Sequence, residues 1–188
     1  MSLRITAGAF RGRLIRTVPG QAVRPSPAML REALFNMIGP AIQGNRFLDL
    51  CAGSGAVGIE ALSRGASHAT FVDNHAASLA VIRRNLEELG ELQRATILRR
   101  DAAHVPDELA RRGERFDVAF LDPPYDTDTA AVCVRAAGLR AIIPARCRLY
   151  IQHRRGAALT AASGWLLADE RRFGDTMLTT LEREEDGA

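Results

Sequence analysis

Residues 122–125, with the sequence Asp122-Pro123-Pro124-Tyr125, combine hydrogen-bond acceptors with an aromatic ring. They follow residues 118–121, an apolar run typical of a buried strand. Because proline has no N–H group, the segment offers a carboxylate and carbonyl oxygens but few donors. These acceptors suit an exocyclic amino group: they can bind both amine hydrogens and turn the nitrogen lone pair towards an electrophile. Tyr125 adds a face for base stacking. The structural alternative is a proline-rich loop that closes a strand.

A second candidate site lies in residues 46–64, which contain a short apolar run, two glycines and an amphipathic pattern. This order predicts a buried strand, a tight turn and a helix. Gly53 and Gly55 lack a Cβ, so the turn can take positive φ and approach a ligand near the free N–H groups of the helix. Open α/β sheets bind nucleotides at such a strand end.

Two ligand classes fit this turn. The glycines at positions 53, 55 and 58 also match G-x-G-x-x-G spacing, which allows a nicotinamide- or flavin-dependent oxidoreductase. Asp49, four residues before Gly53, argues against this because a carboxylate repels a pyrophosphate. It favours a ligand that carries an ammonium and a sulfonium, as S-adenosylmethionine does. A structural role for Asp49, capping the helix, is the remaining interpretation.

Two further acids follow predicted strands. Asp73 ends a predicted strand over residues 69–73, where a carboxylate can accept hydrogen bonds from both ribose hydroxyls. Asp101 and Ala102 follow a predicted strand over residues 95–98, where a carboxylate and a backbone N–H could bind an adenine edge. A helix-capping role for Asp73 is compatible with ribose binding.

Composition limits the function classes. The 188 residues are 47% hydrophobic, and the three cysteines and four histidines form no metal-ligand spacing. We expect no metal site and reduced cysteines. No apolar run is long enough to cross a bilayer and no signal peptide opens the chain, so we expect a soluble, cytoplasmic protein. The sequence is silent on oligomeric state.

The charge of the chain is unevenly distributed. All 25 basic residues are arginines, and six of them precede the first acid, Glu32. Arginine suits bidentate phosphate contacts and base stacking. The predicted nucleic-acid contacts are Arg4, Arg11, Arg13, Arg24 and Arg31. The alternative is an ordinary solvated charged surface.

The remaining pattern predicts how these sites are arranged. Residues 3–6 and 13–18 predict a β-hairpin, and Ser26 with Pro27 begins a helix that ends near residue 39. We therefore expect an N-terminal extension, residues 1–40, packed on a core of residues 41–188. Later segments predict a helix over residues 132–139, a strand over 148–152 and an antiparallel pair over 165–169 and 177–181. The expected fold is α/β and Rossmann-like: a seven-stranded, mainly parallel sheet with an antiparallel C-terminal hairpin.

The motifs resemble those of known families. Asp49-Leu-Cys-Ala-Gly-Ser-Gly55 and Asp122-Pro-Pro-Tyr125 resemble class I, S-adenosylmethionine-dependent methyltransferases that modify nucleobase amino groups. The chain more narrowly resembles the RsmD family in Arg24-Pro25, Arg31-Glu-Ala-Leu-Phe-Asn36, residues 48–64 and Arg172-Phe-Gly-Asp-Thr176.

This resemblance implies methylation of the N2 amino group of one guanine in 16S ribosomal RNA, within a small ribosomal subunit or its assembly intermediate. The cofactor would lie over Ala52, Gly53 and Gly55. Asp73 stands where the family usually has glutamate, so ribose contact would be shared with Asn74. Pro27 and Ala28 also depart from the polar residues common in the family.

Other functions stay open at this stage. A different nucleobase amino-methyltransferase, acting on adenine N6 in RNA or DNA, would use the same Asp-Pro-Pro-Tyr segment. A non-catalytic RNA-binding assembly module would share the basic extension, and an oxidoreductase would share the glycine-rich turn.

Overall fold

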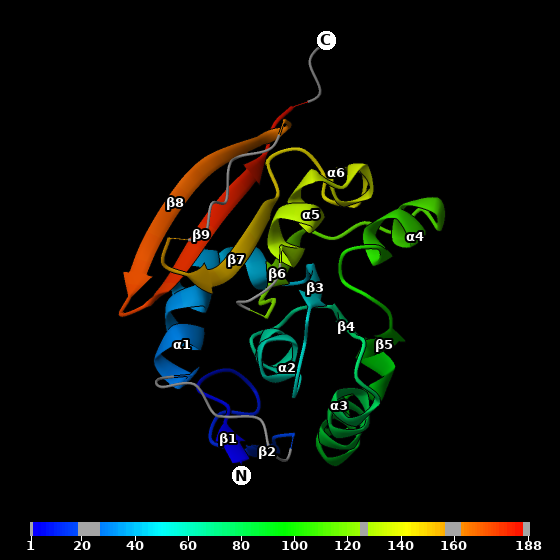
Figure 1. Cartoon of the computed structure of the whole chain (residues 1–188). Helices are drawn as coiled ribbons and strands as arrows, with labels where there is room; N and C mark the ends of the chain where they lie inside the picture. Colours follow the sequence, from blue (N-terminus) through cyan, green and yellow to red (C-terminus); the bar gives the residue numbers. More distant parts are fainter. Residues whose placement is uncertain (1, 19–26, 125–127, 157–162, 186–188) are drawn as a thin grey trace.

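The computed structural model describes residues 2–18, 27–124, 128–156 and 163–185. Seven strands form one sheet in the order β5-β4-β3-β6-β7-β9-β8 (Figure 1). The strands are β3 (Arg46–Leu50), β4 (His68–Asp73), β5 (Ala95–Arg99), β6 (Val118–Leu121), β7 (Arg148–Arg154), β8 (Trp165–Phe173) and β9 (Thr176–Arg183). The first five pair in parallel, whereas β9 is antiparallel to both β7 and β8. The predicted fold class is confirmed.

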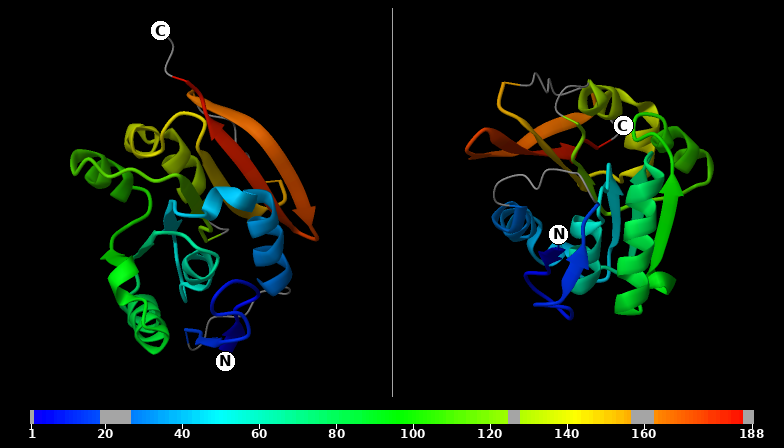
Figure 2. Two further views of the ribbon diagram at one scale, coloured as in Figure 1. Left: turned by 180° about the vertical axis from the view of Figure 1, so that it is seen from behind. Right: turned by 60° about the horizontal axis from the view of Figure 1, so that its bottom comes forward.

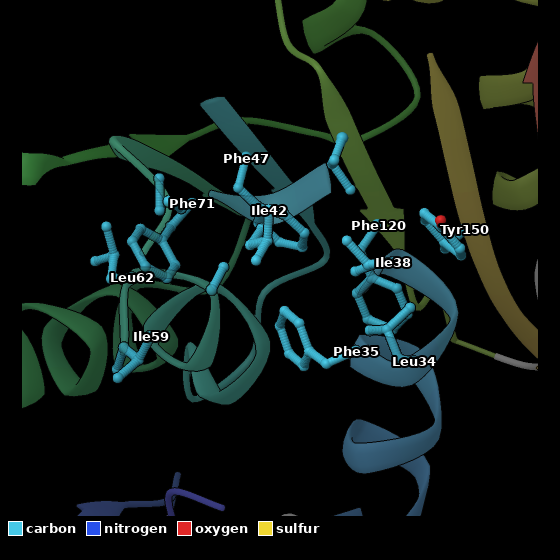
Figure 3. Close-up of a cluster of buried hydrophobic side chains, with 14 of the residues drawn as sticks. Leu34, Phe35, Ile38, Ile42, Phe47, Ile59, Leu62, Phe71, Phe120 and Tyr150 are labelled. Atoms are coloured by element: carbon cyan, nitrogen blue, oxygen red, sulfur yellow. The ribbon is translucent and has the colours of Figure 1, made fainter. Parts of the chain in front are cut away.

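Alternating side chains of the strands enter two cores, one on each face of the sheet. Phe47, Phe71, Phe120 and Tyr150 pack on one face with α1 (Pro27–Ile38), α2 (Ala56–Ser63) and α3 (Ala76–Leu89), as Figure 3 shows for α1 and α2. Intervening residues such as Leu48 and Leu121 pack on the other face. Helices α4 (Val105–Arg111), α5 (Thr129–Arg135) and α6 (Ala137–Ile142) cover that face. The strands are therefore buried between two layers, and their carboxyl ends remain available for a site.

The structure corrects the helix predicted over residues 132–139. That stretch belongs to two helices, α5 and α6, which are separated at Ala136, where the backbone is extended with φ −62° and ψ 126°.

Helix α4 was not predicted from the sequence. Pro106 lies in its first turn, and Asp107 and Glu108 are acids of the kind that favour a helix N-terminus. Two 3-10 turns, η1 (Gly39–Ile42) and η2 (Leu92–Arg94), follow α1 and α3.

The predicted N-terminal hairpin is present but shorter. Strands β1 (Ser2–Arg4) and β2 (Leu14–Arg16) pair in antiparallel fashion, and α1 is the next element. Residues 19–26, which include the predicted N-cap Ser26, lie outside the described part of the chain. Ile5 and Ile15 enter the same core as α2 and α3. Figure 2 shows the hairpin beside these helices, at the end of the molecule away from the C-terminus. The extension is thus packed on the core.

Glu60 of α2 attaches the N-terminal extension to the core. Its side chain is fully buried and accepts hydrogen bonds from the backbone N–H groups of Thr6 (3.2 Å) and Ala7 (3.2 Å). It also pairs with Arg31 of α1 at 3.3 Å and with Arg64 at 3.0 Å. A buried carboxylate is tolerated only when it is paired and hydrogen-bonded, and these partners meet that requirement.

Gly58 sets how closely α2 packs on β4, and this contact yields a test of the fold. A Cβ at this position would overlap the ring of Phe71. We therefore expect Gly58→Ala to lower the free energy of unfolding by about 1–3 kcal/mol, although alanine is the better helix former. Urea unfolding followed by circular dichroism would measure the change. The same substitution in a Phe71→Leu background should cost clearly less; an equal cost in both backgrounds would contradict this packing explanation.

Candidate active site

A cavity of about 670 Å³ opens at the carboxyl edge of the parallel strands. Its lining includes nine residues predicted from the sequence: Asp49, Ala52, Gly53, Asp73, Asn74, Asp101, Ala102, Asp122 and Pro124. The N-terminal extension contributes Leu3, Thr17, Leu30 and Arg31 to the same cavity. Of the remaining residues predicted for catalysis and cofactor binding, Gly55 and Pro123 do not line it, and Tyr125 lies outside the described residues. The geometry thus brings the two candidate sites of the sequence into one space.

The glycines of the turn after β3 have different roles. Cys51, Gly53 and Gly55 all have positive φ, of 63°, 55° and 77°. No atom lies within 4 Å of where a Gly53 side chain would begin, so the backbone there is open to the cavity. A Cβ on Gly55 would instead meet Ile82 at 2.9 Å. Gly53 therefore permits close approach of a ligand, whereas Gly55 permits the left-handed turn and the packing of α3.

Asp49 is the most deeply buried acid of the cavity, with 1% exposure. Its pKa is raised to about 8, mainly by burial; the hydrogen bond from the N–H of Gly58 at 2.9 Å acts in the opposite direction, and the charges of Asp122 and Asp73 contribute to the increase. A ligand cation near Asp49 would favour its ionised form. This carboxylate therefore fits the predicted positively charged end of a cofactor.

Asp73 shapes the glycine-rich turn directly. Its two oxygens accept hydrogen bonds from the N–H groups of Gly53 at 2.9 Å and of His75 at 2.8 Å. Each carboxylate oxygen has a further lone pair, so these bonds leave room for the predicted ribose contact. Asn74 lies beside it on the cavity wall and is exposed.

The other two acids stand after β5 and β6. Asp101 is exposed and accepts a hydrogen bond from the N–H of Ala103 at 2.8 Å, which forms the turn into α4, while Ala102 is buried. Asp122 is half-buried, and its N–H donates to the carbonyl of Leu50 at 3.3 Å. Pro123 is buried and Pro124 is exposed at the cavity.

The predicted nucleic-acid contacts separate into two groups. Arg4, Arg11 and Arg13 are exposed on the hairpin, where Arg4 donates to the carbonyl of Gly12 at 2.7 Å. Arg31, in contrast, is 5% exposed and donates to Glu60 and to the carbonyl of Arg4. Its charge therefore joins the extension to the core instead of adding to the exposed basic surface. Arg24 lies outside the described residues.

Sequence reasoning missed two buried polar residues near the cavity. Asn85 of α3 is 1% exposed, and its amide bonds both the N–H and the carbonyl of Arg16 as well as the carbonyl of Ser54. It links the hairpin to the glycine-rich turn. Its position between the buried residues Ile82 and Leu86 of α3 was the available signal. Gln152 of β7 lines the cavity and is 9% exposed. A single glutamine in an apolar strand gave no comparable pattern.

The described part of the chain contains neither a metal-binding cluster nor a membrane-spanning helix. No three His, Cys, Asp or Glu side chains within it are grouped so that they could hold a metal ion. None of its helices is both long and apolar enough to span a membrane.

The three cysteines, Cys51, Cys133 and Cys147, form no disulfide. Burial raises the pKa of all three thiols, and that of Cys133 to about 12.

Comparison with known proteins identifies the family. The family model described as "Conserved hypothetical protein 95" matches residues 3–182. The chain is 29% identical to ribosomal RNA small subunit methyltransferase D of Escherichia coli K12, over 98% of this chain and 92% of the relative. It is 42% identical to YlbH of Bacillus subtilis, which is provisionally named an rRNA methyltransferase, over 65% of this chain and 67% of the relative.

Solved structures agree with this result. The structure of yhhF from Escherichia coli has a TM-score of 0.85 and 29% identity, over 99% of this chain and 100% of that one. SMU.776, solved in complex with SAH, has a TM-score of 0.69 and covers 92% of this chain and 52% of that one; at 16% identity it supports the fold alone. The matched model spans nearly the whole chain, and the chain belongs to the RsmD family of methyltransferases.

Proposed function

We propose that the chain transfers a methyl group from S-adenosylmethionine to the N2 amino group of a guanine in 16S ribosomal RNA. The observation that carries the proposal is the single cavity that joins the acids of the glycine-rich turn to Asp122 and Pro124. A cofactor and an extracted base could therefore meet in it. The name of the Escherichia coli relative supports small-subunit RNA as the substrate.

The cavity fits the cofactor by its charge. Asp49, Asp73, Asp101 and Asp122 all line it, and the first is the most deeply buried. In this proposal Asp49 holds the methionine end, Asp73 with Asn74 the ribose, and Asp101 with Ala102 the adenine, above Ala52 and Gly53. S-adenosylmethionine supplies an electrophilic methyl group on a sulfonium.

The acceptors after β6 hold the base. Asp122 and the carbonyl of Pro123 or Pro124 accept hydrogen bonds from the amine, and Tyr125 stacks on the ring. These contacts orient the nitrogen lone pair, and the carboxylate stabilises the positive charge that develops on nitrogen. A base in a helix cannot reach this position, so the nucleotide must be turned out of its stack.

Residues 1–40 supply the RNA contact in this proposal, and residues 41–188 the catalytic domain. Arg4, Arg11 and Arg13 lie on the exposed hairpin, and hairpin residues also line the cavity. Phosphate contacts on this extension would position the RNA without reading its sequence. The substrate is small-subunit RNA in an assembling or complete subunit, which places the activity in the cytoplasm.

The central test is methyl transfer from labelled S-adenosylmethionine to three acceptors: small subunits lacking the modification, naked 16S rRNA and duplex DNA. We expect label as N2-methylguanosine in subunits, and a loss of at least about a hundredfold in kcat for Asp122→Asn, because the base is no longer held correctly. Cofactor binding, measured by calorimetry, should persist in that variant.

Other outcomes of this assay would replace the proposal. Label on adenine or on DNA would keep the methyl-transfer chemistry but reject the substrate. Cofactor binding without label in any acceptor would favour an RNA-binding assembly module.

Asp49 predicts a pH dependence of cofactor binding. With its pKa near 8, Asp49 is protonated in the free protein at pH 7, and a bound cation should lower that pKa. Binding should then release up to one proton, and affinity should rise by up to about tenfold per pH unit between about pH 6 and 8. Calorimetry in buffers of different ionisation enthalpy measures the released proton. Asp49→Asn should bind without this proton release; equal release in both proteins would exclude Asp49 as its source.

The hairpin arginines predict a salt-dependent contribution to substrate affinity. Arg11 and Arg13 are exposed, so Arg11→Ala with Arg13→Ala should raise KM for subunits while kcat stays near the wild-type value. The slope of log affinity against log salt should fall by about 1 per lost phosphate contact. Arg115→Ala removes an exposed charge just before β6, at the opposite edge of the sheet, and serves as the control. Equal effects of the two changes would reject a specific role for the hairpin.

A further inference from the structure

Gln152 of β7 places a polar side chain at the cavity. It is 9% exposed, it lines the cavity, and no hydrogen bond joins its side-chain amide to another residue in the described part of the chain. Its neighbours differ: the hydroxyl of Tyr150 donates to the carbonyl of Met37 at 3.5 Å, and His153 contacts the hydroxyl of Thr179 at 2.8 Å. The amide therefore faces the cavity with its donor and its acceptor both available, and a ligand bound there can complete its hydrogen bonds.

The strand register places Gln152 beside Asp122. In the parallel pair of β6 and β7, Phe120 is opposite Tyr150 and Leu121 is opposite Ile151. One further step brings Asp122 opposite Gln152, on strands about 4.8 Å apart. Because side chains alternate, both residues lie on the face of Phe120 and Tyr150, which packs against α1 in Figure 3. A base whose amino group meets Asp122 would therefore present its adjoining edge to Gln152.

The amide matches the edge of one base. Beside its N2 group, guanine carries the N1–H donor and the O6 acceptor, whereas an amide carries one acceptor oxygen and an NH₂ donor. Both amide groups are satisfied if the oxygen accepts from N1–H and the NH₂ donates to O6. Adenine with its amino group at Asp122 would present N1 as an acceptor and would leave the amide oxygen unpaired.

We infer that Gln152 determines base specificity by binding the N1–H and O6 edge of the guanine whose N2 group faces Asp122. This inference rests on the proposed function and adds the residue that selects guanine within it. Gln152 contacts the base but takes no part in bond formation. Its effect should therefore appear as discrimination between bases.

The test compares guanine with 2-aminopurine, which keeps the N2 amine but lacks both O6 and N1–H. Each base is placed at the methylated position of 16S rRNA by splinted ligation, and the RNA is reconstituted into subunits. For wild-type protein we expect kcat/KM to favour guanine by roughly 5- to 150-fold, the range for one bidentate contact to a base. Gln152→Leu should lose most of this preference, with guanine falling to the level of 2-aminopurine.

Three controls keep the outcomes distinct. Gln152→Met repeats the removal of the amide with an unbranched side chain, and cofactor binding by calorimetry reports whether each variant is folded. His153→Leu alters the opposite face of the same strand, so it should leave the base preference unchanged. A guanine preference that persists in both amide-free variants would overturn this inference while methyl transfer stands. Failure of the wild-type protein to methylate guanine would instead reject the proposed function.

Discussion

The burial of one acid among other acids at one sheet edge governs the site, because the nearby charges of Asp122 and Asp73 disfavour the ionised form of Asp49. Asp49, Asp73, Asp101 and Asp122 line one cavity, and the burial that raises the pKa of Asp49 is reinforced by the charges of Asp122 and Asp73. Such a cluster is unfavourable when the cavity is empty, and a cationic ligand relieves it. The same acids disfavour a pyrophosphate ligand, with which the glycine spacing of the turn is otherwise compatible.

The acids could be predicted from the sequence because their positions depend on local patterns. Each follows or ends an apolar strand, and in a parallel sheet the carboxyl ends of strands meet at one edge. Long-range register was needed for Gln152, since only the pairing of β6 with β7 brings it beside Asp122. The division of residues 132–139 into α5 and α6 was missed because Ala136, where the helix breaks, favours helix, and the glycine signal, Gly138, comes two residues later inside α6.

Charge counting alone could not show that one of the N-terminal arginines has a structural role. Arg31 belongs to the acid-free N-terminal segment, yet it is buried against Glu60, an acid 29 positions away in the chain. Glu60 and Asn85 together hold the extension on α2 and α3, and Asn85 bonds Ser54 as well. The extension thus forms part of the cavity wall, and buried polar groups connect the proposed RNA-binding hairpin to the glycine-rich turn.

The neutrality of Gln152 follows from the acids around it. A fifth carboxylate beside Asp122 would add repulsion and could not donate to a base oxygen, whereas an arginine would compete with the cofactor cation for the acids. An amide offers a donor and an acceptor without net charge. In this arrangement charge selects the cofactor at Asp49, and uncharged hydrogen bonding selects the base at Gln152, so one cavity can distinguish two ligands with different physical interactions.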